Sequence, residues 1–191
     1  MSYKPQRIDT SPGSMVQKPI FVRPEILLHS NIPKPLHSVN PRTIKGKDWW
    51  NEKRKKAYAA NNFCCWACGV HKSKDKFHNH LEAHEYYDID YEKGEMRLKE
   101  IVALCHTCHN YIHSGRLSMI LLKGEVSEDD FEYIMAYGRD IIDKNKLTLP
   151  LLPEKIAEWS QWHLILDGEK HFSPFKSYHE WVEHYQTQEE E

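Results

Sequence analysis

The sequence reads CWAC over residues 65–68 and CHTC over residues 105–108, two pairs of cysteines that each enclose a two-residue spacer. A tight turn with this spacer brings two thiolates about 3–4 Å apart, and two such turns supply the four ligands of a tetrahedral zinc ion. Gly69 follows the first pair and gives its turn freedom in φ. The spacing therefore predicts one structural zinc ion bound by Cys65, Cys68, Cys105 and Cys108.

Disulfide bonds are the alternative use of these cysteines. The chain has five cysteines, an odd number, and no N-terminal apolar stretch that resembles a signal peptide, so the sequence does not favour an oxidising compartment. Cys64 is the fifth cysteine. Only its neighbour Cys65 has the two-residue spacer to Cys68, so we expect Cys64 to be a small buried apolar residue.

The composition is typical of a protein inside the cell, in the cytoplasm or with nucleic acid. Of the 191 residues 40% are hydrophobic and 28% charged, and no apolar run reaches the roughly 18–20 residues of a membrane span. The net charge of −2 hides an asymmetry. Residues 1–62 carry 12 basic and 4 acidic groups (+8), residues 63–117 carry 7 and 8 (−1), and residues 118–191 carry 7 and 16 (−9). The basic residues of 1–62 favour binding to phosphate groups, whereas the acidic residues of 118–191 favour contact with a protein partner.

Local patterns divide the chain into three parts. Residues 1–47 contain seven prolines and no lasting periodicity, which predicts an extended arm that lies over the core. Residues 48–117 contain the cysteine pairs, preceded by a basic helix over 49–61. Residues 118–191 form an acidic module with a helix and a β-hairpin.

Within the central part, strands are expected over residues 77–85 and 95–104, joined by an acidic loop that closes in a turn at Lys93-Gly94 and part of which can also pair as strand. A short helix follows Cys105, and Gly115 is expected to end it.

The C-terminal module shows two clearer signals. Ser127 precedes three acidic residues and is expected to cap a helix that runs to about Asp143. Asp167-Gly168 is typical of the two-residue turn of a hairpin.

Three histidines of the central part predict a second metal site. His109 and His113 are four residues apart on the short helix, so both imidazoles project from one face. His84 lies on the strand that the cysteine pairs would hold beside this helix. The alternative is that these are surface or core histidines on a zinc-stabilised scaffold, because the chain contains 13 histidines.

These features together resemble the HNH endonucleases, whose active site is a ββα-metal unit, and in particular the members with treble-clef zinc knuckles. The likeness covers about fifty residues, from Cys65 to Arg116, and depends on the cysteine pairs, LEAHE at 81–85 and EIVALCHTCHNYIH at 100–113. It implies an α+β fold with a small zinc-stabilised core, extended by the proline-rich arm and by the C-terminal helix and hairpin.

The resemblance also implies roles for individual residues. His109 takes the position of the closing histidine that binds the catalytic divalent ion, His113 that of a further ligand one turn on, and His84 that of the opening histidine. Glu100 stands where the family has its middle asparagine, which is a departure from the pattern.

A second departure concerns the opening pair, which is Asp-His or His-His in most members. This chain has Ala83-His84-Glu85 instead. If His84 is the base that activates water, Asp88, Asp90 or water completes the metal site. If His84 binds the ion, Glu85 is the remaining base.

The implied activity is hydrolysis of phosphodiester bonds with one divalent cation, which the sequence leaves open between Mg²⁺, Mn²⁺, Ni²⁺ and Zn²⁺. The expected partner is nucleic acid, with DNA favoured and no membrane. Backbone phosphates would meet five basic residues, namely Lys53, Arg54, Lys55, Lys56 and Arg116. The departures keep open a second hypothesis, a catalytically inactive zinc-binding module that binds nucleic acid or a protein partner.

Overall fold

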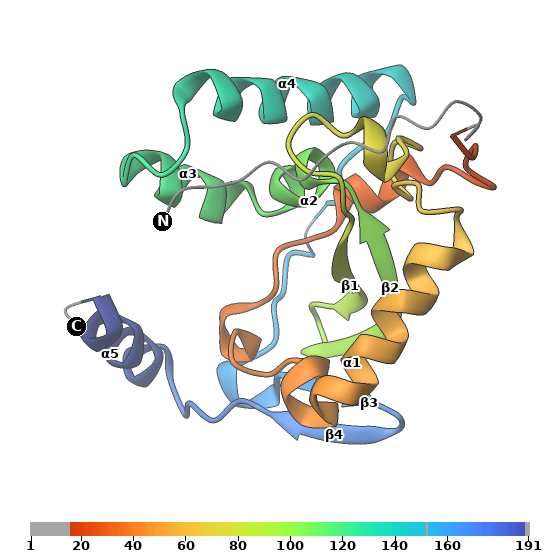
Figure 1. Ribbon diagram of the computed structural model, residues 1–191. Coiled ribbons are helices and arrows are strands. Elements are labelled where there is room, and N and C mark those ends of the chain that lie inside the picture. The colour runs from red at the N-terminus through yellow and green to blue at the C-terminus, as the bar shows by residue number, and fades with distance from the viewer. Residues whose placement is uncertain (1–15, 152, 190–191) are drawn as a thin grey trace.

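The protein is a mixed α+β structure built on one four-stranded sheet, and the computed structural model describes residues 16–151 and 153–189 (Figure 1). The order of the strands is β1-β2-β3-β4. The pairs β1–β2 and β3–β4 are antiparallel, whereas β2 and β3 are parallel. The strands are β1 (Glu82–Asp90), β2 (Glu95–Leu104), β3 (His163–Leu166) and β4 (Glu169–Phe172).

Five α-helices and four short 3-10 helices complete the described part of the chain. Helix α1 packs mainly on β2, and α2 contacts β1, β2, α3 and α4 at the upper end of the sheet in Figure 1. The α-helices are α1 (Pro41–Ala60), α2 (His106–Ile112), α3 (Ser114–Leu122), α4 (Glu128–Lys144) and α5 (Tyr178–Glu189). The 3-10 helices are η1 (Pro24–Leu28), η2 (Lys34–Leu36), η3 (Lys72–Lys74) and η4 (Trp159–Gln161). Among the described residues no helix has the length and apolar character to cross a bilayer.

The β1–β2 hairpin agrees with the sequence in its second strand and differs in its first. The expected strand over 95–104 is confirmed, whereas the strand expected over 77–85 lies at Glu82–Asp90. The segment expected mainly as a loop, from Tyr86 onward, pairs with the first half of β2 across a register shift between Tyr86 and Tyr87. Pairing with β2 therefore makes this segment a strand despite its acidic sequence. Residues 75–80, part of which was expected to be strand, form an irregular loop.

The prediction that Gly115 ends a helix is wrong. Helix α2 stops at Ile112, His113 forms a junction with φ −91° and ψ 37°, and α3 begins at Ser114. Gly115 lies in the first turn of α3. The chain continues as helix because α3 buries Leu117 and packs on α4.

The C-terminal elements follow the sequence signals. The Ser127 hydroxyl accepts a hydrogen bond from the Asp130 amide (3.2 Å) at the start of α4, as expected of a cap. Asp167 and Gly168 have φ of 52° and 85°, which a two-residue hairpin turn with two left-handed residues requires. Strand β3 joins β2, so the sheet includes residues on both sides of the expected boundary at 117/118.

The sheet has a buried apolar cluster at each end. The first surrounds the cysteine pairs and includes Trp50 of α1 and Leu104 of β2. The second lies near the β1–β2 turn and the C-terminal hairpin, and includes Met96, Trp162 and Leu164. The first end therefore combines thiols and imidazoles with apolar packing, whereas the second end is held by apolar packing alone.

The described part of the N-terminal arm lies along the side of the sheet (Figure 1); residues 1–15 of the expected arm fall outside the described ranges. The fully buried side chain of Asn61 fixes the arm. Its Oδ1 accepts hydrogen bonds from the amides of Ile20 (2.7 Å) and Phe21 (3.1 Å), and its Nδ2 donates to the Phe21 carbonyl (3.0 Å). Helix α1 begins at Pro41, but Gly46 has a non-helical φ of 81° and ψ of 175°, so a kink close to the expected boundary at 47/48 divides α1 into two helical segments.

Candidate metal centres

The four cysteines of the two pairs converge at the end of the β1–β2 hairpin. Their sulfur atoms all lie within 4.8 Å of one another, and the Sγ atoms of Cys68 and Cys105 are 3.7 Å apart. Tetrahedral zinc with Zn–S bonds of about 2.3 Å has ligand-to-ligand distances of about 3.8 Å. The four-cysteine group therefore has the spacing to hold a metal ion such as zinc.

Backbone hydrogen bonds build the first turn of this group. The Cys65 amide donates to the Val70 carbonyl (2.8 Å), and the Gly69 amide donates to the Cys65 carbonyl (2.9 Å). Gly69 has φ 78°, and a Cβ at this position would lie 2.9 Å from the Val22 side chain of the arm. The Trp66 amide donates to the Ala103 carbonyl (2.8 Å), which ties the turn to the end of β2.

The second pair begins a helix. Cys105 is the N-cap of α2, and its Sγ accepts a hydrogen bond from the Cys108 amide (3.5 Å). Hydrogen bonds from the thiols of Cys105, Cys108 and Cys65 hold the pKa of the Cys68 thiol well below its usual range, whereas contacts within the same group raise the pKa of the Cys105 and Cys108 thiols. A thiolate is the form that binds zinc. Cys64 is buried and outside the four-cysteine group, with its thiol 3.5 Å from the Gln17 carbonyl.

The three histidines singled out from the sequence form a second group, in which one ring nitrogen of each lies within 4.8 Å of the others. His84 comes from β1, His109 from α2 and His113 from the α2–α3 junction. The Nε2 atom of His113 is 3.2 Å from Nδ1 of His84. Tetrahedral ligands at 2.0–2.1 Å from zinc lie about 3.3 Å apart, so this spacing also suits a shared ion.

The environment of His84 favours a neutral ligand. The side chain is buried, and its Nε2 has no hydrogen-bond partner within the described residues. Burial, together with the neighbouring rings of His113, His29 and His109, lowers the pKa of His84 to about 2. Metal ions bind the neutral form of imidazole. Nδ1 is the nitrogen of His84 that faces His113, so it is the atom that would bind the ion.

Glu82 is part of this group's surroundings, and the sequence analysis missed it. Its Oε2 is 2.6 Å from Nδ1 of His109, and its Oε1 is 2.7 Å from Nδ1 of His106. Burial opposes ionisation of Glu82, but the hydrogen bonds from His106 and His109 outweigh it and hold the pKa well below its usual range. A carboxylate behind a metal-binding histidine fixes the orientation of the ring. The sequence could have identified Glu82, because residues two positions apart in a strand lie on the same face and Glu82 is two positions before His84.

The other acidic candidates lie elsewhere. Glu85 follows His84 on β1 and therefore points to the opposite face; it interacts electrostatically with His109 and Arg42, and burial raises its pKa. Asp88 and Asp90 line a separate cavity, where Asp90 pairs with Lys93 (2.7 Å). The three histidines therefore converge without Asp88 or Asp90.

Glu100, which stands at the place of the family's middle asparagine, binds the arm. One of its carboxylate oxygens is 2.6 Å from Nη1 of Arg23. The guanidinium of Arg23 lies over the rings of Trp66 and Tyr86, 5.8 Å from each centroid. Glu100 thus ties the N-terminal arm to the middle of β2.

The basic residues expected to meet phosphate occupy two places. Lys53, Lys55 and Lys56 are exposed on α1, where Arg54 is half-buried, and Lys56 pairs with Glu52 (2.6 Å). Arg116 is exposed on α3. Burial, His109, His29 and Arg116 together lower the pKa of His113 to about 4, so Arg116 lies near the histidine group.

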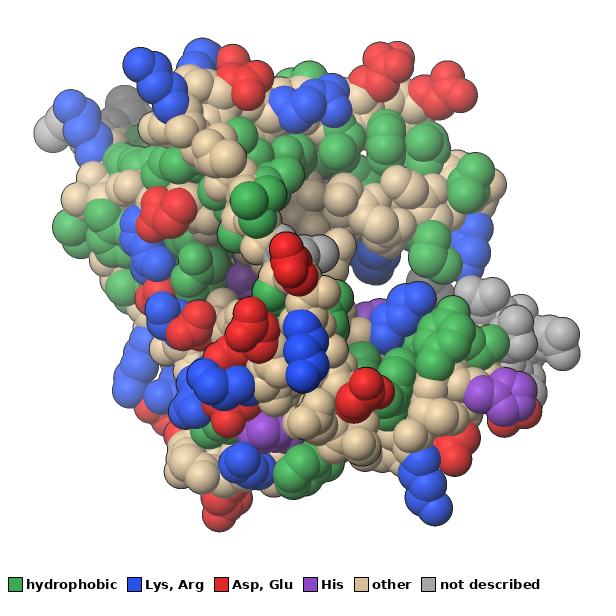
Figure 2. Space-filling view, turned by 180° about the vertical axis from the view of Figure 1, so that it is seen from behind, with side chains coloured by type: hydrophobic (Ala, Val, Ile, Leu, Met, Phe, Trp, Pro, Cys, Tyr) green, Lys and Arg blue, Asp and Glu red, His purple; other side chains and the backbone are tan. Residues whose placement is uncertain are grey.

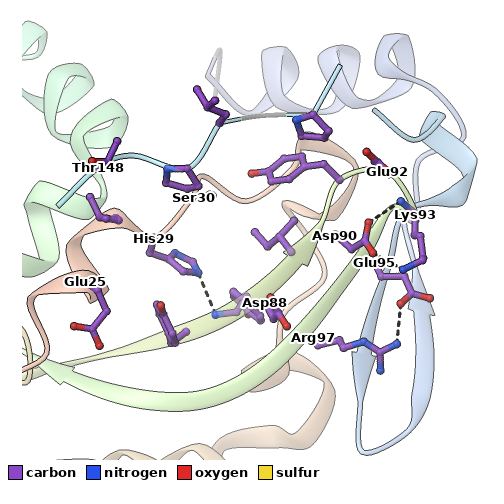
Figure 3. A pocket seen from close by; sticks show the side chains of 18 residues that line it. Glu25, His29, Ser30, Asp88, Asp90, Glu92, Lys93, Glu95, Arg97 and Thr148 are labelled. Carbon is purple, nitrogen blue, oxygen red and sulfur yellow. Dashed lines mark hydrogen bonds and ion pairs between the residues drawn. The ribbon is translucent and has the colours of Figure 1, made fainter. Parts of the chain in front are cut away.

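The separate cavity has a volume of about 830 Å³ and lies between the arm, β1 and four residues after α4, namely Thr148, Pro150, Leu151 and Pro153 (Figure 3). His29 separates the cavity from the histidine group. Its Nε2 accepts a hydrogen bond from the Tyr87 amide (3.1 Å), and its ring is 5.2 Å from that of His84. Five carboxylates line this cavity against two basic groups, so a phosphate would be repelled there.

A scan against protein-family models finds no match to this chain, and searches of the curated proteins and of the solved structures find none either. What the structure establishes is a mixed α+β protein whose clustered cysteines and histidines can bind metal ions.

Proposed function

We propose that this protein is an HNH-type metal-dependent endonuclease that hydrolyses phosphodiester bonds of nucleic acid, with DNA as the favoured substrate. In this proposal β1, β2 and α2 are the ββα-metal unit, and the four-cysteine group is the structural zinc site of a treble-clef scaffold. The observation that supports it most is the convergence of His84, His109 and His113. The resemblance implies metal binding for His109 and His113, and either metal binding or activation of water for His84.

His84, His109 and His113 would hold the catalytic divalent ion. Such an ion stabilises negative charge on the scissile phosphate and the leaving oxygen. The protein's own groups then have separate tasks. Glu82 keeps the ring of His109 oriented through the 2.6 Å contact with Nδ1. Burial, together with the rings of His113, His29 and His109, lowers the pKa of His84 and keeps it neutral.

Glu85 is the remaining candidate for the general base in this proposal, although its side chain points to the face of β1 opposite His84 and would reach a water at the histidine group only after a local rearrangement. The grouping of His84 with the two helix histidines favours the alternative in which His84 is a ligand, and this leaves Glu85 as the adjacent acid. Burial raises the pKa of Glu85, which is the direction that improves a carboxylate as a base at neutral pH. Arg116, near His113, and the basic run of α1 would bind backbone phosphates without reading the bases.

A catalytically inactive zinc module that binds nucleic acid or a protein is the second candidate. Two observations favour it: Ala83 replaces a residue that most members use, and Glu100 is engaged by Arg23. The face shown in Figure 2 also carries basic and acidic side chains interspersed with one another, whereas a continuous basic surface would bind nucleic acid better.

Cleavage of a supercoiled plasmid in Mg²⁺, Mn²⁺, Ni²⁺ or Zn²⁺ tests the proposal. We expect the wild-type protein to nick or linearise the plasmid and His84→Ala and His109→Ala to lose at least about 100-fold in rate, with unchanged circular dichroism. His179→Ala is the matched control, because His179 is exposed on α5 and pairs only with Glu183 among the ion pairs of the described residues. Binding of DNA without cleavage in any of the four metals would reject the nuclease and favour the inactive module.

A further inference from the structure

A third group of potential ligands lies beside the histidine group and is not used by the proposed reaction. It consists of His78, Glu82 and His106, one ligand atom of each lying within 4.8 Å of the others. The three residues come from the irregular loop over 75–80, the first position of β1 and the first position of α2. Because three separate segments bring them together, helical spacing does not explain their proximity.

We propose that His78, Glu82 and His106 bind a further divalent transition-metal ion of the zinc class, distinct from the ion of the histidine group and coupled to it through the Glu82 carboxylate. Two imidazoles and a carboxylate are a donor set that zinc uses where further coordination positions stay open for water. All three side chains are half-buried, so an ion reaches them from solvent and keeps such positions open.

The charges around this group favour a cation. The Asp75 carboxylate accepts a hydrogen bond from the His106 amide (3.0 Å), and Asp130 of α4 interacts electrostatically with His106. Lys76 is the nearby basic residue, and its ammonium is paired with Asp130 at 3.2 Å. Three carboxylates against one ammonium leave a negative potential, which attracts a divalent cation.

The geometry shows how the ligands would rearrange. The rings of His78 and His106 have centroids 4.3 Å apart at an angle of 75°. Oε1 of Glu82 and Nδ1 of His106 are 2.7 Å apart, which is a hydrogen bond. Two ligands of a tetrahedral zinc ion are about 3.3 Å apart, so the carboxylate and the imidazole separate by about half an ångström when the ion binds.

Glu82 makes the two groups interdependent. While Oε1 faces His106, Oε2 holds Nδ1 of His109 in the neighbouring group. An ion on Oε1 withdraws negative charge from the carboxylate and weakens its hydrogen bond to His109. Each ion therefore lowers the affinity of the other, and the effect is reciprocal.

Zinc stoichiometry of the full chain tests this proposal without any nucleic acid. After equilibrium dialysis against Zn²⁺, elemental analysis is expected to find three ions in the wild-type protein and two in His78→Ala. His80→Ala is the matched control, since its ring stacks on His78 at 4.7 Å but lies outside the group; it is expected to keep three. Three ions in His78→Ala, or an equal loss in His80→Ala, would overturn the assignment.

Two further measurements separate this ion from the others. His113→Ala is expected to lose the ion of the histidine group and to keep the one at His78, so that titration of this variant with Zn²⁺ shows tighter binding at the remaining site. Anomalous diffraction at the zinc edge from wild-type crystals locates the ions directly. Absence of a peak among His78, Glu82 and His106 would refute the site even if the chain proved to be an active nuclease, and a peak there would support it even if the chain proved inactive.

Discussion

The two ends of the sheet are held together by different means. At the end where Glu82 pairs with Leu104, the interior contains thiols and imidazoles whose spacing suits metal ions. At the other end, where Asp90 pairs with Glu95, the interior consists of Met96, Trp162 and other apolar side chains. We therefore expect the first end to depend on a metal ion as well as on buried apolar area, and the second end to depend on buried apolar area alone.

Removal of zinc is expected to have the largest effect and to act at the first end. Binding of a structural zinc ion to four thiolates contributes on the order of 10–16 kcal/mol, as much as the entire stability of a typical domain. Chelation, or Cys108→Ser, is expected to abolish hydrogen-exchange protection over residues 63–116. Cys64→Ser, at a buried thiol outside the four-cysteine group, is expected to retain it. A chelated sample with unchanged melting would contradict the prediction.

A cavity at the second end is expected to cost less and to leave the metals in place. Leu164 of β3 is fully buried in the apolar cluster, and Leu→Ala at such sites costs about 2–5 kcal/mol. Urea denaturation of Leu164→Ala measures this loss, and elemental analysis is expected to find unchanged zinc content. Leu122→Ala is the control, because Leu122 is 87% exposed on α3 and the change should stay within about 0.5 kcal/mol. Loss of zinc from Leu164→Ala would show that the two ends are one cooperative unit.

Short-range chemistry made much of the metal end predictable. The two-residue spacers located the four-cysteine group, and the four-residue spacing of His109 and His113 located two of the three histidines of the second group. Ser127 and Asp167-Gly168 identified the start of α4 and the hairpin turn in the same way. Each of these signals lies within a few residues of its consequence, so local stereochemistry determines the outcome.

Long-range contacts account for what the sequence did not predict. The shift of β1 to Glu82–Asp90 depends on its register with β2, and the pairing of β3 with β2 joins residues more than 60 positions apart. Glu82 was not predicted as a site residue because its role depends on contacts with His106 and His109. These contacts form only when the β1–β2 hairpin packs against α2.

The smallest effect is expected at Glu100, which holds the N-terminal arm against the middle of β2 through Arg23. Its ion pair with Arg23 is short at 2.6 Å, but the two side chains are 34% and 31% exposed, so solvent screens the interaction to about 0.5–1 kcal/mol. Glu100→Gln should therefore lower stability by about this amount, measured by urea denaturation, and should increase hydrogen exchange at the amide of Arg23, which donates to the Trp66 carbonyl. Glu25→Gln removes the other, more exposed partner of Arg23 and should have a smaller effect. If Glu100→Gln instead left the arm unchanged and altered cleavage, Glu100 would support the proposed reaction rather than the arm. Asn61 would then hold the arm by itself.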